Sequence, residues 1–433
     1  MRSTFRSLRG YNYRAWAIGA FVSNVGTWMQ RTAQDWIVLT ALTAHSATAV
    51  GIVMALQFGP TAVLLPFAGF AADHFDRRKL LFWTQGAMGA LALGLGLLTV
   101  TGVVTLWEVY AFALALGVAT AFDAPARQTF VSELVGESDL SNAVALNSTS
   151  FNAARLIGPA VAGTMIHVLG SGWVFLLNAA SYVAVLGSLR VLRVEELHRG
   201  ARAARARGSF AEGLRYVRGR PDLVAVLAML FLIGTFGLNF PIFLSTMSVM
   251  VFHAGAREYG LLTSTMAVGS VLGALLSAGQ ERPRAALLLG GAAAFGIGCA
   301  IAALMPDYWL FGAVLVAVGI SVQVFNTTAN ATMQLSTDPV MRGRVMALVM
   351  AIALGGTPIG APLVGWVADT FGPRWSLGVG AASGLLAAVV GVRYLVRHRR
   401  LSVRLESGRL RFRLAPSAIA AAAAAVEAEA SRF

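Results

Sequence analysis

Charged residues are scarce in this chain. They make up 12% of its 433 residues, whereas 57% of the residues are hydrophobic. A soluble protein carries about 25% charged residues, and the mean hydropathy here is +0.69. So much apolar surface has to face lipid rather than water. The composition therefore excludes an ordinary soluble globular protein.

Cysteine and lysine are almost absent. Cys299 is the only cysteine, which excludes an internal disulfide and a cysteine-rich metal site. Lys79 is the only lysine, and no phosphate-binding Walker loop surrounds it, which argues against an ATP-driven pump. The six histidines lack ligand spacing, so we expect no metal site and no cofactor other than a proton gradient as energy source. No cluster of catalytic side chains lies at one depth, so we do not expect an enzyme.

Long apolar runs are plentiful. A span needs about 20 apolar residues to cross a bilayer, and an open sheet cannot satisfy its backbone in lipid. The runs do not alternate in polarity, so we predict an all-α integral membrane protein with twelve transmembrane helices. The predicted spans cover 14–41, 48–72, 80–101, 104–126, 143–168, 172–193, 222–252, 258–279, 284–305, 308–334, 343–369 and 374–397.

The arginines predict the orientation, because basic residues favour the cytoplasmic side of a membrane. The net charge is +14, yet the arginines lie between apolar runs rather than in one domain, so we expect no nucleic-acid partner. With a cytoplasmic N-terminus, all basic residues lie on the cytoplasmic side except Arg31, Arg155, Arg257 and Arg374. We therefore predict a multi-pass protein of the plasma (inner) membrane with both termini in the cytoplasm. The first apolar run is too long for a cleaved signal peptide.

The longest interruption divides the chain into two related halves. We predict an N-terminal six-helix bundle at 1–193, a cytoplasmic Arg-rich linker at 194–221, a C-terminal six-helix bundle at 222–398 and a cytoplasmic tail at 399–433. In the linker, 210–218 is either an amphipathic helix on the membrane surface or a solvated segment. Several motif residues of the first half recur in the second at a constant offset. Such pseudo-symmetry favours a transporter with its site between the halves.

A glycine, an aspartate and basic residues mark the predicted loop between spans two and three. Gly69 permits close helix packing, and Asp73 at a helix end can face the N-terminus of another helix. Arg77, Arg78 and Lys79 can pair with a carboxylate or with lipid headgroups. A plain positive-inside loop would explain the arginines, but not the spacing of Gly69 and Asp73.

This loop resembles the hallmark of the major facilitator superfamily, Gly-x-x-x-Asp-Arg-x-Gly-Arg-Arg/Lys. Gly69, Asp73, Arg77 and Arg78 match it, while His74 and Asp76 depart from it. The resemblance implies that the loop latches the halves in the outward-facing state, with the aspartate at the N-terminus of helix eleven. It also implies an acidic partner on helix four, a role for which Asp123 is in position.

Further motifs narrow the resemblance to the enterobactin-exporter branch, which includes drug:proton antiporters. They comprise Trp28-x-x-Arg31, Asp123-x-Pro125-Ala126-Arg127 and Arg155-Leu-Ile-Gly158-Pro159, and the similarity runs from about Tyr13 to Gly391. Gly158, Pro159 and Gly163 also resemble a proline-glycine motif of exporters. Ordinary helix packing is the alternative, because glycine and proline are frequent in membrane helices.

Arg31, Asp35 and Arg155 lie well inside predicted spans, where charge is costly and usually functional. Arg31 and Asp35 are four residues apart on one helix face, in the outer half of span one, and Arg155 is near the midplane. Our hypothesis is that Asp35 carries the coupling proton while Arg31 and Arg155 hold it or an anionic substrate. A structural ion pair is the alternative. Amides such as Asn24 and Asn152 can line the cavity or join helices.

These observations predict a secondary transporter, with proton-coupled efflux of a drug-like or siderophore-like small molecule by alternating access as the leading hypothesis. A proton-coupled importer and a non-transporting scaffold or sensor on the same fold are the alternatives. The expected partners are a small-molecule substrate and membrane lipid, and we expect a monomer.

Overall fold

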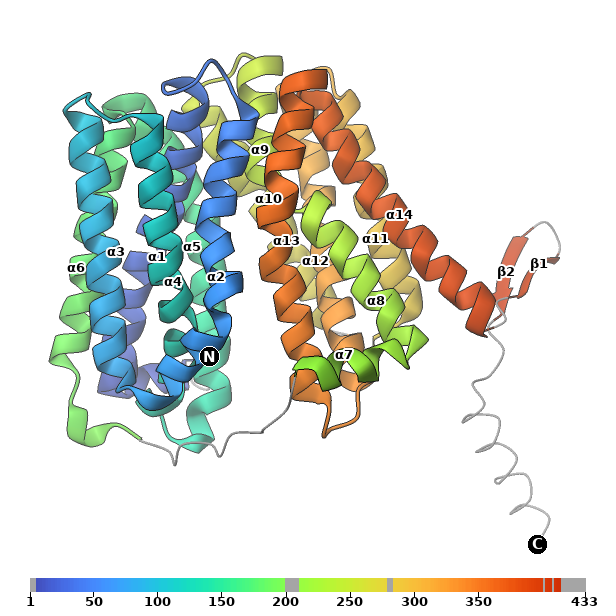
Figure 1. The fold of residues 1–433 in the computed structure, drawn as a ribbon, viewed down its shortest axis with the longest axis horizontal. Coiled ribbons are helices and arrows are strands. Elements are labelled where there is room, and N and C mark those ends of the chain that lie inside the picture. Colours follow the sequence, from blue (N-terminus) through green and yellow to red (C-terminus); the bar gives the residue numbers. More distant parts are fainter. Residues whose placement is uncertain (1–4, 199–209, 279–282, 400–401, 407–408, 414–433) are drawn as a thin grey trace, which may run out of the picture.

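The chain folds into long helices that run side by side (Figure 1). The computed structural model describes residues 5–198, 210–278, 283–399, 402–406 and 409–413. The part of the linker at 199–209 and the end of the tail at 414–433 lie outside these residues, so the predictions for them concern a part of the chain that is not described. The elements of the first half are η1 (Arg6–Arg9), α1 (Tyr11–Thr40), α2 (Ala47–His74), α3 (Arg77–Val100), α4 (Leu106–Leu134), α5 (Glu137–Leu169), α6 (Ser171–Val191) and η2 (Val194–Glu196).

The second half begins after the linker and contains a broken helix. Within the run Pro221–Val251, the π-helical segments η3 and η4 interrupt the α-helix, and such interruptions often mark functional sites. The elements are α7 (Phe210–Arg218), α8 (Pro221–Leu232), η3 (Ile233–Gly237), α9 (Phe240–Thr246), η4 (Met247–Val251), α10 (Ala256–Ala278), α11 (Ala285–Leu304), α12 (Tyr308–Leu335), α13 (Arg342–Phe371), α14 (Pro373–Arg399), β1 (Ser402–Glu406) and β2 (Arg409–Arg413).

Ten helical segments among the described residues are long and apolar enough to cross a membrane. The helices α1 and α5 are not among them, although they have 30 and 33 residues. They carry polar and charged side chains, including Arg31, Asp35 and Arg155. These charged residues lower the mean hydropathy of α1 and α5. The chain is a multi-pass integral membrane protein.

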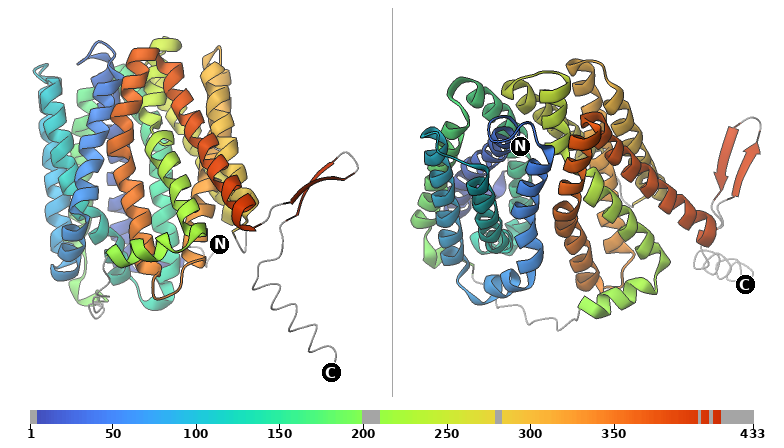
Figure 2. Two further views of the ribbon diagram at one scale, coloured as in Figure 1. Left: turned by 45° about the vertical axis from the view of Figure 1, so that its right-hand side comes forward. Right: turned by 45° about the horizontal axis from the view of Figure 1, so that its top comes forward.

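Two helix pairs join the halves. The helix α2 lies along α13, and α5 lies along α10 (Figures 1 and 2). A Cβ atom on Gly163 of α5 would lie only 2.5 Å from the carbonyl oxygen of Ala256, so the absence of a side chain permits the close approach. We call the end of the molecule with η1, α7 and the end of α14 the termini end, and the opposite end the distal end.

The tail differs from the sequence prediction. No strand was expected, but β1 and β2 pair as an antiparallel hairpin from Ser402–Arg413 to Glu406–Arg409. Apolar and basic residues alternate along both segments, a period that suits a strand and not a helix. The possible amphipathic helix of the linker does form, as α7.

Candidate functional site

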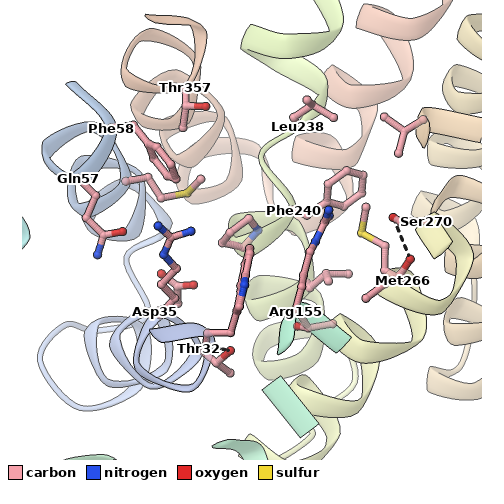
Figure 3. Close-up of a pocket in the computed structure, with 18 of the residues that line it drawn as sticks. Thr32, Asp35, Gln57, Phe58, Arg155, Leu238, Phe240, Met266, Ser270 and Thr357 are labelled. Carbon is pink, nitrogen blue, oxygen red and sulfur yellow. Dashed lines mark hydrogen bonds between the residues drawn. The ribbon is translucent and has the colours of Figure 1, made fainter. Parts of the chain in front are cut away.

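A cavity of about 300 Å³ lies between the halves. The first half contributes residues from α1, α2 and α5, and the second half contributes residues from α10, α12, α13 and the broken helix (Figure 3). A concave site lined mainly by apolar groups with a few polar ones is typical of a small-molecule site. Its lining includes Trp28, Arg31, Thr32, Asp35, Met54, Gln57, Phe58, Arg155, Leu238, Phe240, Tyr259, Met266, Ser270, Gln323, Asn326 and Thr357.

Two guanidinium groups share one tryptophan in this cavity. The Cζ atom of Arg31 lies 5.0 Å from the ring centroid of Trp28, and that of Arg155 lies 5.8 Å from the same ring. Arg31 also lies 5.4 Å from the ring of Phe58. Each contact is within the range of a cation–π interaction. Trp28 therefore positions both arginines on the cavity wall.

Neither guanidinium has a hydrogen-bond or ion-pair partner among the residues that the structure describes. The Nε atom of Arg31 is buried and unpaired. Other arginines are satisfied, for example Arg127 by Asp123 at 3.0 Å and Arg374 by the carbonyl oxygen of Ala303 at 2.7 Å. Leaving a charged donor unpaired away from water is costly. The two cavity arginines are thus free to bind a ligand.

Among the described residues, Asp35 is the one acidic residue on the cavity wall, and 8% of its surface is exposed. The Tyr259 hydroxyl donates a hydrogen bond of 3.3 Å to its Oδ2 atom. The structure shows no ion pair between Asp35 and Arg31, although both lie on the same face of α1. The partner of Asp35 in this conformation thus comes from the second half.

The described residues of the second half contribute no charge to the cavity. Leu238, Phe240 and Met266 provide apolar surface, while amides and hydroxyls such as Gln323 and Ser270 provide polar groups. Figure 3 shows Leu238, Phe240, Met266 and Ser270 across the cavity from Asp35 and Gln57. All three charges of the cavity therefore belong to the first half.

Two amides predicted for the cavity lie elsewhere. Asn24 accepts a hydrogen bond of 3.0 Å from Arg127, two helical turns along α1 from Arg31. Asn152 is exposed and donates to the carbonyl oxygen of Ser148. Neither belongs to the cavity lining. The amide on the wall that does face the charges is Gln57, which donates to Gln34 at 3.0 Å.

The hallmark residues Gly69, Asp73, Arg77 and Arg78 of the loop at the termini end form no hydrogen bond or ion pair with the described residues of the second half. A Cβ atom on Gly69 would meet no atom within 4 Å, and Asp73 is exposed without a partner in the described part of the chain. Arg77 pairs with Glu133 of α4 at 2.6 Å. Arg78 donates to the carbonyl oxygen of Leu189 at 2.7 Å. The basic residues of the loop thus bind their own half.

Asp123 does not pair with the loop arginines in this conformation. It binds Arg127 at 3.0 Å and accepts hydrogen bonds from Thr84 at 2.8 Å and Gln85 at 2.6 Å. Asp123 is buried, and these donors satisfy its carboxylate. The acidic partner of Arg77 in the loop is Glu133. The sequence pointed to Asp123 instead, because Asp123 and Glu133 lie on the same helix, α4.

The glycine-proline motif of α5 packs at two interfaces. A Cβ atom on Gly158 would lie 2.6 Å from the Cβ atom of Trp28, so Gly158 lets α5 approach the tryptophan that holds both arginines. Gly163 faces Ala256 of α10, and the carbonyl oxygen of Pro159 contacts Gly260. The motif thus determines the distance from α5 to α1 and to α10.

Asp369 closes the distal end, a role that the sequence did not indicate. Its carboxylate accepts hydrogen bonds from the backbone N–H groups of Ala47 and Thr48 at 2.6 Å and 2.9 Å, and from the Ser46 hydroxyl at 3.1 Å. It therefore caps α2 of the first half from the end of α13 of the second half. An aspartate near a helix C-terminus is a weak signal by itself, and its partner is remote in the sequence.

Short segments hold the starts of α5 and α13 at the termini end. Ser7 of η1 donates from its backbone to Asn142 at 3.0 Å, and Arg6 pairs with Asp139. In the second half, Glu212 of α7 pairs with Arg344 at 3.2 Å, and Tyr216 donates to Asp338 at 2.9 Å. The helix α7 is therefore docked on the start of α13 and on the segment before it.

An arginine joins α7 to α8. Arg220 forms a bidentate pair with Asp222 and donates to the carbonyl oxygen of Ser336 at 2.9 Å. The hydrogen bonds to Asp222 raise the pKa of the Arg220 guanidinium above its ordinary value, so the group stays charged.

Solved structures resemble this fold over most of its length. A bacterial homologue of the human lysosomal transporter Spinster, in an inward-facing and occupied conformation, has a TM-score of 0.69 at 14% identity, covering 88% of this chain and 97% of that one. The nucleoside transporter NupG has a TM-score of 0.68 at 14% identity, covering 88% and 99%. The chain thus shares the fold of two membrane transporters.

Sequence comparison identifies the family. The family described as transmembrane secretion effector matches residues 2–414, and the chain belongs to it. Curated relatives include the staphyloferrin A transporter of Staphylococcus aureus, 24% identical over 89% of this chain and 96% of the relative. The multidrug efflux pump Tap of Mycolicibacterium fortuitum is 26% identical over 89% and 95%. The enterobactin exporter EntS of Shigella flexneri is 26% identical over 89% and 91%.

These findings confirm the predicted superfamily and exporter branch. They also confirm that the chain is a secondary transporter and not an enzyme, since the family and the relatives are transporters.

Proposed function

We propose that this protein exports a small organic molecule, driven by the proton-motive force. The observation that carries the proposal is the cavity between the halves, in which Asp35, Arg31 and Arg155 gather inside the membrane-spanning part. Export follows from the relatives, among which are a multidrug efflux pump and an enterobactin exporter. Alternating access exposes this cavity to each side in turn.

The topology that fits this function has twelve spans. It adds α1 and α5 to the ten apolar segments, so that a six-helix bundle precedes the linker and another follows it. The termini end then faces the cytoplasm and the distal end faces outward. The protein works in this proposal as a monomer in the plasma membrane, with lipid and substrate as its partners.

Two aspartates would stabilise the two end states. Asp369 of α13 caps α2 at the distal end in the present conformation. At the other end of the molecule, Asp73 of α2 has no partner in the described part of the chain and would cap the start of α13 once the distal end opens. The caps are mutually exclusive, because the halves approach at only one end at a time. The present conformation is inward-facing in this proposal.

Asp35 is the proposed site of the coupling proton. It is buried on the cavity wall, and its partner Tyr259 belongs to the opposite half. A carboxylate that changes protonation there alters a contact between the halves, which couples the proton to the conformational change.

Flux through proteoliposomes tests the function. The protein would be reconstituted with the fluorescent dye naphthalene-2-sulfonate on the termini side, and dye transfer would be measured with and without an imposed proton-motive force. We expect transfer toward the distal side that a protonophore abolishes. Transfer in the opposite direction would identify an importer, and no flux of any solute would favour a scaffold or sensor.

A further inference from the structure

The geometry assigns the cavity to an amphipathic organic anion, whose oxyanion binds Arg31 and Arg155 and whose apolar body faces the second half. This inference deepens the proposed function and rests on it.

The balance of charge in the cavity supports an anion. Two arginines face one aspartate, and the remaining lining residues are uncharged. With Asp35 ionised, the cavity carries one net positive charge, and a proton on Asp35 increases it. A cationic ligand would have to approach two desolvated guanidinium groups, which repel it strongly where the dielectric constant is low. The cavity is therefore selective for negative charge.

The arrangement of the arginines supports an oxyanion in particular. Both guanidinium groups lie against the ring of Trp28, at 5.0 Å and 5.8 Å. Their contacts with described residues are to aromatic faces, which leave the edges with the N–H donors available. Arg31 has a buried Nε atom that lacks an acceptor. A planar fork of donors matches the oxygens of a carboxylate, sulfonate or phosphate ester.

The opposite wall supports an apolar body. Leu238, Phe240 and Met266 lie across the cavity from Asp35 (Figure 3). Their apolar surface suits an aromatic or aliphatic group, and Met266 can adapt to its shape. Gln323 and Asn326 of α12 add hydrogen-bonding groups without charge. The ligand is thus held by charge on one half and by apolar contact on the other.

Binding to the purified full-length protein tests this assignment. Isothermal titration calorimetry would compare naphthalene-2-sulfonate, which is ionised at every working pH, with neutral naphthalene-2-sulfonamide of nearly the same shape. We expect the sulfonate to bind at least about tenfold more tightly, because hydrogen bonds to charged groups contribute more than neutral ones. A naphthylmethylammonium cation should bind more weakly than both.

Variants locate the selectivity. Arg31→Gln and Arg155→Gln should each lower sulfonate affinity by about tenfold and leave sulfonamide affinity nearly unchanged. Arg155→Lys retains the charge and should lose less, which keeps the test available if a glutamine variant misfolds. Arg374→Gln is the matched control, because it removes a satisfied arginine away from the cavity. The Arg374→Gln variant should prefer the sulfonate to the sulfonamide by the same factor as the unmodified protein.

Two results overturn the inference. One is a sulfonate that does not bind, or that binds no more tightly than the sulfonamide. The other is a selectivity that survives both glutamine variants. Flux measurements distinguish failure of this inference from failure of the proposed function. Export of neutral or cationic solutes without a preference for anions would contradict only the inference. Anion-selective binding with no flux would remove only the proposed export.

Discussion

Trp28 is the residue on which the geometry of the cavity depends most directly. Its ring contacts both guanidinium groups, and its Cβ atom packs against Gly158. The variant Trp28→Leu should lower the affinity for naphthalene-2-sulfonate by up to about thirtyfold, because two cation–π contacts of about 1 kcal/mol each are lost. Trp28→Phe retains an aromatic face and should lose clearly less. Calorimetry on both variants measures the difference, and equal losses would contradict a role for the ring.

Asp35 gives the second prediction at this scale. The variant Asp35→Asn is neutral at every pH, so it cannot exchange a proton during transport. We expect it to bind the sulfonate at least as tightly as the unmodified protein, and to lose the acceleration of flux by a pH gradient. Flux in liposomes with an imposed gradient checks this result. Asp307→Asn is the control, because Asp307 caps α12 away from the cavity. An intact response in Asp35→Asn would exclude the coupling role.

The sequence identified Arg31, Asp35 and Arg155, because charge in an apolar run is conspicuous. It did not identify their partners. Tyr259 reaches Asp35 from the opposite half of the chain, and only the three-dimensional arrangement of α1 and α10 brings them together. The spacing of Arg31 and Asp35 correctly indicated one helix face, but did not indicate that Trp28 and Phe58 would hold the guanidinium.

At the scale of helices, the caps on α2 and α13 decide which end of the molecule is closed. Removing a cap typically costs about 1 kcal/mol, which corresponds to about a fivefold change in a population ratio. Asp369→Ala should therefore shift the protein by about fivefold toward the distal-open state. Distances between spin labels at Ala44→Cys and Thr370→Cys measure the two populations. The control is Asp307→Ala, which removes a cap within one half and should not shift them.

The loop motif should act in the opposite direction. Asp73 has no partner while the distal end is closed, so Asp73→Ala should leave that state unchanged and destabilise only the distal-open state. The same labels should then report a larger distal-closed fraction. A shift in the same direction as Asp369→Ala would contradict the proposed exchange of caps.

The apolar runs predicted the positions of the helices more accurately than the residues at which the helices end. The helix α4 continues to Leu134, beyond the predicted span 104–126, because its last turns carry Glu133 and Phe130 into contacts at the termini end rather than into lipid. The π-helical segments near Leu238 were not foreseen, since Pro241 and Gly237 in an apolar run fit a continuous membrane helix equally well.

At the scale of the molecule, the labelling of single cysteines from either side of the membrane tests the proposed orientation of the two ends. Cys299 is fully buried, so replacing it with serine gives a background for single-cysteine labelling. An impermeant maleimide should label Ala44→Cys from the outside of intact cells, and Val340→Cys only in inverted vesicles. Val340 is 84% exposed at the termini end. Labelling of both positions from one side would contradict the proposed topology.

The confinement of charge to one half of the cavity has an electrical consequence. With an ionised Asp35, the empty cavity carries one positive charge, and a bound monoanion neutralises it. The loaded carrier therefore turns outward with little sensitivity to voltage, whereas the empty carrier returns with the coupling proton on Asp35 and thus with two positive charges. An inside-negative potential of 100 mV favours that return by up to about 2.3 kcal/mol for each charge. The resting voltage of the cell would thus reset the carrier after each release, and transport should generate a measurable current.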